Sequence, residues 1–365
     1  MSTGTKKRGG FWRAIGWFLA ICVVLELGLR LFGYGSFTNY RPDDRLLWVP
    51  EPGRTLTVVN HLPITINHQG FRYASDLKPK EKDQFRVIAF GDSTTQGWGM
   101  DDNSHYSAQL EKMLGASGCN REHFQVVSAG VNAYPNSLVE EKLKLVIEDP
   151  TFQPDVVVRS YSFNTNFENL PKLQGEARKQ FLWRVEFKSI VRRSAIYNFF
   201  IEDLFREIAY YKLRHVLMQG SLSTVEGNGD LDVDGFNASL RESLELAQTH
   251  HSQLVLLVLG GDGLTKDSDM HPFQRAMLQF AQNEHVPVVN LIEVMRNKDQ
   301  NEMYMDPAHP TVAGHKIIAE ELYKTIRQLP VYNEACQVPG VNMANSVAPA
   351  TAPSTVKTQV DSKER

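Results

Sequence analysis

Short apolar runs alternate with longer amphipathic segments between residues 86 and 329, and this alternation constrains the fold more than any other feature of the chain. The first run, at residues 87–90, is continuously apolar, which is typical of a strand buried on both faces of a parallel sheet. Strands that take turns with helices in this way build a layered α/β structure. We expect about five strands, at residues 87–90, 124–128, 155–158, 254–259 and 286–290. We expect helices at residues 105–114, 136–147, 239–250, 273–283 and 315–329.

The first apolar run is followed directly by Gly91, Asp92 and Ser93. This order predicts a glycine-hinged turn from a strand into a helix, with a hydroxyl near the helix N-terminus, where negative charge is stabilised. A nucleophilic serine needs exposure and an oxyanion site of this kind. The same three residues also suit a simple helix cap, so the tripeptide alone leaves both interpretations open.

A second group of polar residues precedes the last predicted helix. Asp306 and His309 are three residues apart on a loop that also contains Pro307 and Pro310. This spacing lets the carboxylate reach the imidazole, select its tautomer and stabilise the imidazolium, as serine catalysis requires. Taken singly, each of the two residues is more often structural. His315, already inside the helix, is expected to be a packing residue.

Together these motifs resemble those of the GDSL, or SGNH, hydrolase superfamily over about residues 86–329. Gly91-Asp92-Ser93 is similar to its first block, and the Asp-x-x-His pattern of Asp306 and His309 is similar to its fifth. The resemblance implies a three-layer, flavodoxin-like α/β fold. It also implies a catalytic triad of Ser93, His309 and Asp306, with no cofactor and no metal.

The second and third blocks of that superfamily imply the groups that bind the oxyanion. Gly130 follows the second predicted strand, as the glycine of the second block does, and Asn164 takes the place of the third-block asparagine. Two neighbouring positions of the third block depart from the family pattern. The resemblance therefore implies an oxyanion hole of Ser93, Gly130 and Asn164. Asn166 lies two residues further on, and the spacing does not exclude it because side chains alternate along an extended chain.

The activity that the resemblance implies is hydrolysis of an ester, in particular a small O-acyl group on a cell-surface glycan or lipid. An O-acyltransferase with the same triad is an alternative, and so is a catalytically silent glycan-binding protein. The net charge of −3 gives no general electrostatic case for a nucleic-acid partner. The three cysteines have no metal-ligand spacing, and a Cys119–Cys336 disulfide is compatible with the sequence but not required by it.

A basic leader at residues 1–13 precedes an apolar segment at residues 14–32. As a helix this segment would reach roughly 28 Å at 1.5 Å per residue, which is close to the thickness of a bilayer core. Glu26 and Arg30 are four residues apart within it and can pair on one helix face. We expect an uncleaved signal anchor, with a single membrane pass and the catalytic domain outside the cytoplasm. A cleaved signal peptide is the alternative.

The rest of the chain divides into four segments. Residues 33–84 alternate apolar and polar side chains and predict a β-rich preface with a small antiparallel hairpin. The hydrolase domain is expected at residues 85–330. It contains a basic, aromatic insert at about residues 167–231 that is longer than an ordinary loop. This insert either packs on the domain as a helical pair or acts as a lid or substrate platform that faces the membrane surface. Residues 337–365 have little apolar content and predict a disordered tail.

Overall fold

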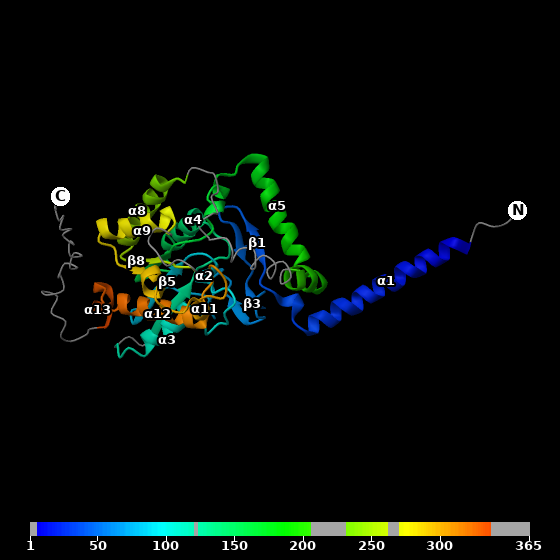
Figure 1. Ribbon diagram of the computed structural model, residues 1–365, viewed down its shortest axis with the longest axis horizontal. Coiled ribbons are helices and arrows are strands. Elements are labelled where there is room, and N and C mark those ends of the chain that lie inside the picture. Colours follow the sequence, from blue (N-terminus) through cyan, green and yellow to red (C-terminus); the bar gives the residue numbers. More distant parts are fainter. Residues whose placement is uncertain (1–5, 120–122, 206–230, 262–269, 337–365) are drawn as a thin grey trace, which may run out of the picture.

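The computed structural model describes residues 6–119, 123–205, 231–261 and 270–336. These residues form an α/β body, two small antiparallel hairpins beside it and a long N-terminal helix that projects away from it (Figure 1). The segment predicted to be a disordered tail lies outside the described residues, as do residues 1–5 of the predicted leader.

Five parallel strands make up the central sheet, as predicted. They are β5 (Gln84–Phe90), β6 (His123–Ser128), β7 (Val156–Ser160), β8 (Gln253–Val258) and β9 (Val288–Asn290). Their order across the sheet is β6-β5-β7-β8-β9, so the chain passes from β5 outward to β6 and returns to β7 on the other side. Ligands of open α/β sheets bind outside the carboxyl ends of the strands at such a reversal.

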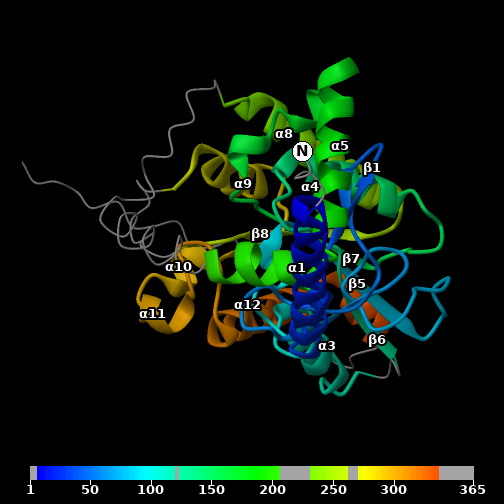
Figure 2. The same cartoon turned by 90° about the vertical axis from the view of Figure 1, so that its right-hand side faces the viewer.

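Helices cover both faces of the sheet, which confirms the expected three layers (Figure 2). One face carries α4 (Asn136–Ile147), α8 (Val233–Thr249) and α9 (Pro272–Asn283). The other carries α3 (Tyr106–Gly115), α12 (Val312–Ile326) and α13 (Pro330–Cys336). The shorter α2 (Ser93–Gln96), α10 (Leu291–Met295) and α11 (Gln300–Met303) lie in connecting segments.

Two of the helices begin earlier than predicted, because polar caps precede their apolar stripes. α8 begins at Val233 rather than at residue 239. The Asp232 side chain caps this start by accepting a hydrogen bond from the Gly235 N–H. α12 begins at Val312 rather than at residue 315. The Thr311 side chain caps this start by accepting a hydrogen bond from the Gly314 N–H. Such caps satisfy backbone donors that the first turn of a helix leaves unpaired.

The N-terminal region consists of α1 (Lys6–Leu31), the single turn η1 (Tyr34–Ser36) and two antiparallel hairpins, one more than predicted. β1 (Tyr40–Asp43) pairs with β2 (Leu47–Pro50), and β3 (Gly53–Leu56) pairs with β4 (Pro63–Ile66). Within α1, the 22 residues Gly10–Leu31 are long and apolar enough to cross a membrane by length and composition, and the most apolar 18-residue stretch of them has a mean hydropathy of 2.0.

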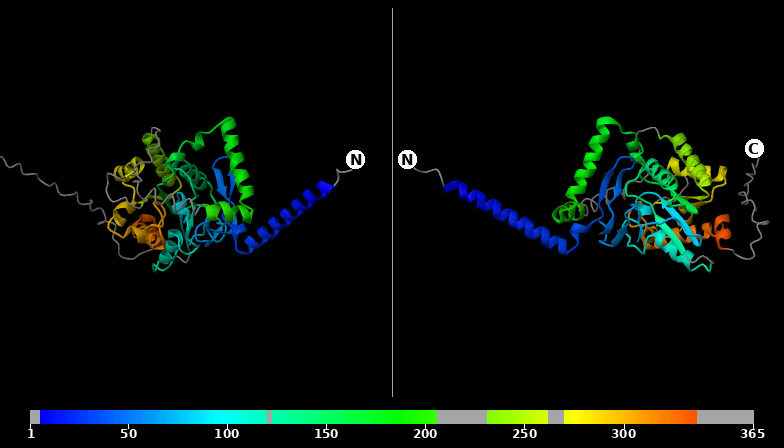
Figure 3. Two further views of the ribbon diagram at one scale, coloured as in Figure 1. Left: turned by 45° about the vertical axis from the view of Figure 1, so that its right-hand side comes forward. Right: turned by 180° about the vertical axis from the view of Figure 1, so that it is seen from behind.

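The described part of the insert ends at Phe205 and is mostly helical. It contains η2 (Thr165–Phe167), η3 (Leu170–Lys172), α5 (Gly175–Val191), α6 (Ala195–Tyr197) and the π-helical η4 (Asn198–Phe205). α5 lies along β1, with Phe181, Leu182 and Val185 packed toward the main core. Both views in Figure 3 place α5 at the side of the body from which α1 projects.

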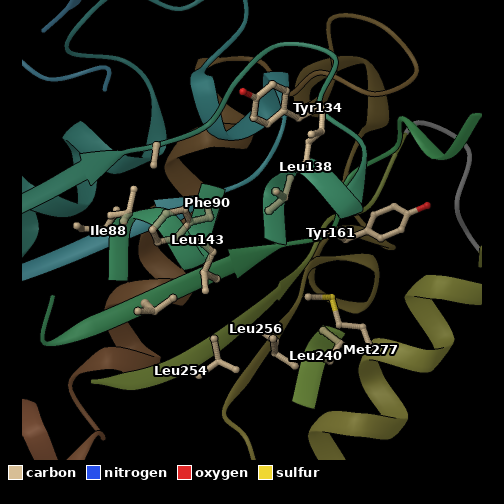
Figure 4. Packing of buried hydrophobic residues seen from close by; sticks show 14 of the residues in the cluster. Ile88, Phe90, Tyr134, Leu138, Leu143, Tyr161, Leu240, Leu254, Leu256 and Met277 are labelled. Carbon is tan, nitrogen blue, oxygen red and sulfur yellow. The ribbon is translucent and has the colours of Figure 1, made fainter. Parts of the chain in front are cut away.

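Side chains of each strand enter two cores in turn, because residues alternate between the faces of a sheet. Ile88 and Phe90 of β5 pack in one core, whereas Val87 and Ala89 pack in the other. Figure 4 shows the first of these cores, where side chains from the sheet meet those of α4, α8 and α9. The two faces of the central sheet are therefore each covered by a separate apolar core.

Cys119 and Cys336 form a disulfide, the pairing that the sequence left open. It joins the chain beyond α3 to the end of α13 across a sequence separation of 217 residues. A cross-link of this kind stabilises a fold mainly by restricting the unfolded chain. Cys22, within α1, is a free thiol.

Candidate active site

Ser93 occupies the first position of α2, on the strand-to-helix turn that the sequence predicted. β5 ends at Phe90, Gly91 and Asp92 form the turn, and α2 lasts four residues before Gly97, with φ of 82°, ends it. The backbone N–H at the first position of a helix has no partner within that helix. Ser93 is 7% exposed, so its hydroxyl is near the surface but largely enclosed.

The Asp92 carboxylate caps α2 and also joins it to the segment that follows β7. Its Oδ1 accepts a hydrogen bond from the Thr94 N–H at 2.9 Å. Its Oδ2 accepts from the Phe163 N–H at 3.1 Å and from Nδ2 of Asn164 at 3.2 Å. Burial raises the pKa of this carboxyl, and the hydrogen bonds from its neighbours and the proximity of His309 oppose that rise. The capping interpretation is thus correct, and the same side chain also connects two parts of the site.

The loop between α11 and α12 brings His309 to the serine. Oγ of Ser93 and Nε2 of His309 are 2.8 Å apart, although 216 residues separate them in the sequence. On the other side of the ring, Nδ1 lies 2.7 Å from Oδ2 of Asp306. Oδ1 of Asp306 accepts the backbone N–H groups of Ala308 at 2.9 Å and of His309 at 2.8 Å. The structure therefore brings the three predicted triad residues into direct contact.

The Asp306 carboxyl is stabilised in its ionised form. Burial alone would raise its pKa, but the hydrogen bond and charge of His309 and the backbone donors of the loop outweigh burial, and the pKa is lowered. An ionised carboxylate beside Nδ1 keeps that nitrogen protonated and leaves Nε2 able to accept a proton. This arrangement has the chemistry needed to deprotonate the Ser93 hydroxyl.

Gly130, the second predicted oxyanion residue, packs directly on α2. A Cβ atom at this position would lie 2.7 Å from the carbonyl carbon of Thr95 and closer still to the Gln96 nitrogen. Because those neighbours are backbone atoms, only glycine fits here without moving α2. The sequence signal for Gly130 therefore corresponds to a close backbone approach beside the serine.

Asn164, the third predicted oxyanion residue, immediately precedes η2 and contacts the serine turn. Its Nδ2 lies 3.2 Å from Oδ2 of Asp92 and 3.2 Å from the carbonyl oxygen of Tyr134. Asn166, which the spacing did not exclude, is an exposed residue within η2. Of the two asparagines, Asn164 is the one whose amide points toward the turn that carries the serine.

Arg72 supports the turn after α2, and sequence reasoning did not identify it. Its guanidinium is buried and donates to the carbonyl oxygens of Gln96, Gly97 and Met100 at 2.7, 2.8 and 2.7 Å. Burial lowers the pKa of Arg72 to about 10, and Asp102 opposes that effect. The sequence placed Arg72 only within the β-rich preface at residues 33–84, which says nothing of these contacts.

A cleft beside α2 is lined by residues from several distant segments, among them Tyr40, Trp98, Asn132 and Arg192. The Trp98 ring lies next to that of His309, with centroids 5.7 Å apart. Gln96 extends toward the cleft, and its Oε1 accepts hydrogen bonds from the Tyr40 hydroxyl and the Asn132 N–H, both at 3.1 Å. Sequence reasoning missed this cleft because its walls come together only in the folded chain.

The Nε2 atom of Gln96 is buried and has no hydrogen-bond partner among the described residues. A buried donor without a partner is costly, so such atoms mark places where a ligand or a water molecule binds. Arg192 stands at the C-terminal end of α5, so the insert contributes to the wall of this cleft.

His315 is a packing residue, as expected. Its ring stacks on that of Tyr106, and its Nδ1 accepts the Tyr106 N–H at 3.3 Å. Burial lowers the pKa of His315 to about 3, so the ring is neutral at pH 7. Across the described ranges, no group of three or more His, Cys, Asp or Glu side chains is placed to hold a metal ion.

The three-layer fold, the serine on the turn after β5 and the Asp-x-x-His loop against it define an SGNH-type carboxylic ester hydrolase. The chain belongs to the GDSL-like lipase/acylhydrolase family, whose family model matches residues 89–317. The family and the enzyme class expected from the sequence are thereby confirmed. No curated protein matches the chain.

Among solved structures, 57 chains match. A lipase/acylhydrolase from Enterococcus faecalis is 14% identical over 67% of this chain and 95% of its own, with a TM-score of 0.41. The acetyl xylan esterase AlAXEase is 15% identical over 66% of this chain and 100% of its own, with a TM-score of 0.42. Axe2, an acetylxylan esterase from Geobacillus stearothermophilus, is 16% identical over 67% of this chain and 96% of its own, with a TM-score of 0.40. We draw no conclusion about the substrate from likeness at this level.

The lowered pKa of Asp306 predicts a pH-dependent contribution to stability. A carboxyl whose pKa is lower in the folded than in the unfolded chain stabilises the fold above its unfolded pKa of about 3.9, and this contribution is lost as the pH falls through the folded value. The difference in free energy of unfolding between wild type and Asp306→Asn should therefore be present at about pH 5 and should shrink below about pH 4.

Urea denaturation of both proteins across that pH range measures this difference. Ser93→Ala is the control, since it leaves the Asp306 carboxylate and its donors in place, and its difference from wild type should not shrink in the same window. If the difference in free energy of unfolding between wild type and Asp306→Asn instead grows as the pH falls, the lowered pKa of Asp306 is contradicted.

Proposed function

We propose that this hydrolase is a membrane-tethered serine esterase that removes a small O-acyl group from a glycan or lipid at the cell surface, with Ser93 as the nucleophile. One observation carries the proposal: the continuous chain of contacts from Ser93 Oγ to His309 Nε2 at 2.8 Å and from His309 Nδ1 to Asp306 Oδ2 at 2.7 Å. A hydroxyl, a base and an orienting carboxylate in this order activate serine for covalent catalysis.

In the first half of the reaction, Nε2 of His309 takes the hydroxyl proton while Oγ of Ser93 attacks the acyl carbonyl carbon. Asp306 stabilises the imidazolium without taking the proton itself. When the tetrahedral intermediate collapses, the bond to the alcohol oxygen breaks and His309 passes its proton to that oxygen. The alcohol leaves, and the acyl group remains bound to Ser93.

In the second half, His309 takes a proton from water, and the resulting hydroxide attacks the acyl carbon on Ser93. The ester bond to Oγ breaks, the proton returns from His309 to Oγ, and the carboxylic acid leaves. The enzyme is then in its starting state, so the cycle requires no co-reactant other than water.

Negative charge on the carbonyl oxygen would be held by the N–H groups of Ser93 and Gly130 and by the Asn164 amide. The Ser93 N–H has no partner within α2 because Ser93 is the first residue of that helix. Gly130 lies where its backbone packs against the backbone of α2. The Asn164 amide contacts are long, at 3.2 Å. Catalytic hydrogen bonds are often loose before substrate binds, so one amide N–H would turn from these acceptors to the oxyanion.

Side chains beside α2 would contact the alcohol part of the substrate. They combine the rings of Tyr40 and Trp98 with hydrogen-bonding groups of Gln96, Asn132 and Arg192. Aromatic faces with a few placed polar groups suit a ligand rich in hydroxyl groups.

Two observations support the proposed location outside the cytoplasm. The apolar part of α1 is long enough to span a bilayer and follows a basic leader. The Cys119–Cys336 disulfide belongs to an oxidising compartment, since cytosolic thiols are kept reduced. The proposal therefore places the leader in the cytoplasm and the α/β body on the other side of the membrane.

Ser93→Ala should abolish labelling by a fluorophosphonate probe and should lower ester turnover by at least about 10⁴-fold, because the nucleophile is gone while binding groups remain. Gel fluorescence and hydrolysis of a chromogenic acetate ester measure the two effects. Thr94→Ala is the matched control, since it removes the neighbouring hydroxyl and should keep its labelling. Full labelling of Ser93→Ala, with the fold intact by circular dichroism, would falsify the assignment.

Asn164→Ala should lower the turnover number by roughly a hundredfold or more with a modest change in KM, because an oxyanion donor acts mainly in the transition state. Asn166→Ala, at an exposed position of the same segment, is the matched control and should change the rate much less. Thermal unfolding of both variants separates this effect from loss of the Asn164 contact with Asp92. If Asn166→Ala has the larger effect, the oxyanion assignment is wrong while the triad assignment stands.

A phosphatase reporter fused to the C-terminus should be active, since that reporter folds only after export. In intact cells Cys119 and Cys336 should resist alkylation until a reductant is added, because they are joined in an oxidising compartment. Activity of a cytoplasm-dependent reporter at the same position contradicts this topology. Recovery of the protein in the soluble periplasmic or culture fraction, shortened at its N-terminus, favours the cleaved signal peptide.

A further inference from the structure

Large apolar side chains that face solvent are concentrated in two parts of the described chain. One is the projecting α1 with Phe32, and the other is the insert. The exposed residues of the insert are Phe167, Trp183, Phe187, Ile190, Phe200, Ile201, Leu204 and Phe205. In the remaining described ranges only Leu231 and Val312 are similarly exposed. Exposed apolar side chains concentrated in one segment mark an interaction site rather than an ordinary protein surface.

The long insert helix α5 is apolar on two sides. Leu182 and Val185 face the body and pack against the main core. Trp183, Phe187 and Ile190 follow a spacing of four and three residues, so they share another face of the helix, and they are 53–63% exposed. The body of the protein covers the side of α5 that carries Leu182 and Val185 and leaves the other apolar side exposed.

The first turn of α6 is fastened to α1 by the side chain of Glu26. Oε1 of Glu26 accepts the Ala195 N–H at 2.9 Å, and Oε2 accepts the Ile196 N–H at 3.0 Å and the Ser194 hydroxyl at 2.9 Å. Arg30, one turn further along α1, pairs with Glu26 at 2.8 Å. The charges that interrupt the apolar segment in the sequence therefore have partners, as charged groups in a membrane helix require.

A second set of contacts joins η4 to the chain just beyond α1. The Tyr34 hydroxyl donates to the Asp203 carboxylate at 3.0 Å. Nδ2 of Asn198 donates to the Tyr34 carbonyl oxygen at 2.5 Å, and the rings of Tyr34 and Phe199 meet edge to face at 5.1 Å. The insert is thus attached to the outer end of α1 by two independent groups of contacts.

These contacts determine the depth of the insert relative to a bilayer. The 22 residues Gly10–Leu31 would extend about 33 Å, slightly more than the roughly 30 Å of a hydrocarbon core. Glu26 lies five residues before Leu31, which is about 7.5 Å along the helix axis. The start of α6 therefore sits about 7.5 Å inward from the outer end of α1, within the roughly 5–10 Å that interfacial helices are buried.

The orientation of α5 also agrees with a position at the surface of the bilayer. In Figures 1 and 3, α5 ends beside the outer end of α1 and runs across its axis, along the edge of the body that faces the direction in which α1 projects. If α1 crosses the bilayer, α5 lies along its surface, with the face that the body leaves uncovered toward the lipid.

The charge of this segment suits a bilayer that contains anionic lipid. Residues 175–193 include six basic residues, Arg178, Lys179, Arg184, Lys188, Arg192 and Arg193, and two acidic ones, Glu176 and Glu186. Lys188 and Arg192 lie within ion-pair distance of Glu202, and Arg193 lies within ion-pair distance of Glu51, so the attraction to anionic lipid rests on Arg178, Lys179 and Arg184. Aromatic rings at the headgroup level with Lys and Arg beside them are typical of interfacial helices. Basic groups near a membrane surface are attracted to anionic lipid headgroups.

We propose that α5 and η4 form a second membrane contact, which lies in the interfacial layer of the outer leaflet and is seated on an anionic phospholipid surface. The inference rests on one part of the proposed function, that α1 spans the bilayer. It adds that the body does not swing freely on α1 but is held against the membrane. Arg192, which follows α5, also lines the cleft beside α2, so this contact would bring the catalytic body close to esters carried at the membrane surface.

Site-directed spin labels on the full-length chain in phosphatidylglycerol-containing nanodiscs test this contact. Single cysteines are introduced in a Cys22→Ser background as Phe187→Cys, as Glu242→Cys on exposed α8, and as Trp17→Cys within α1. Accessibility of each label to oxygen, which partitions into lipid, is compared with accessibility to a water-soluble nickel complex. We expect the oxygen-to-nickel ratio at residue 187 to be several-fold higher than at residue 242 and lower than at residue 17.

The outcomes separate failure of this inference from failure of the proposed anchor. A lipid-like ratio at residue 17 with equal, water-like ratios at residues 187 and 242 overturns the membrane contact and leaves the anchor in place. A water-like ratio at residue 17 overturns the anchor and the inference with it. Spin–spin broadening at residue 187 indicates a second copy on this face, and a label shielded from both reagents indicates cover by another part of the chain; either result overturns the inference. Retained fluorophosphonate labelling shows that each variant is folded.

Discussion

The buried carboxylate of Asp92 is the interaction on which the geometry of the site depends. It accepts hydrogen bonds from Thr94 in α2 and from Phe163 and Asn164 after β7, so it joins two elements that belong to different strands of the sheet. A carboxylate with 1% exposure is tolerated only because it is hydrogen-bonded on both oxygens. Through these bonds the position of Ser93 is coupled to that of the proposed oxyanion donor.

Rigid contacts on the other sides of α2 complete this arrangement. Gly130 brings the backbone after β6 against the helix, and Arg72 binds three carbonyl oxygens in the turn that follows it. A helix of four residues has little stability of its own, so the environment holds it in place. His309 can then meet Ser93 at hydrogen-bond distance because its own loop is fixed by the Asp306 carboxylate. Such pre-organisation lowers the cost of aligning the reacting groups.

The insert relates the catalytic body to the proposed membrane anchor. The inner face of α5 packs on β1 and the core, and Arg192 at the end of α5 lines the cleft. The N-terminus of α6 is capped by Glu26 of α1. The two interpretations that the sequence left open for this segment, packing and a substrate platform, are therefore compatible. One helix packs on the body, contributes to the cleft wall and presents an apolar face outward.

The sequence by itself determined the α/β class, the five strands, the serine turn and the Asp-x-x-His loop, because each depends on neighbours within a few residues. Apolar runs and capping residues act locally, so their pattern can be read along the chain. Only the tertiary structure decided that Asn164 rather than Asn166 faces the turn, that Arg72 supports it, and that Glu26 caps a helix 169 residues away. Those contacts depend on segments that meet through the order of strands in the sheet and the path of the insert, and no local pattern encodes such a meeting.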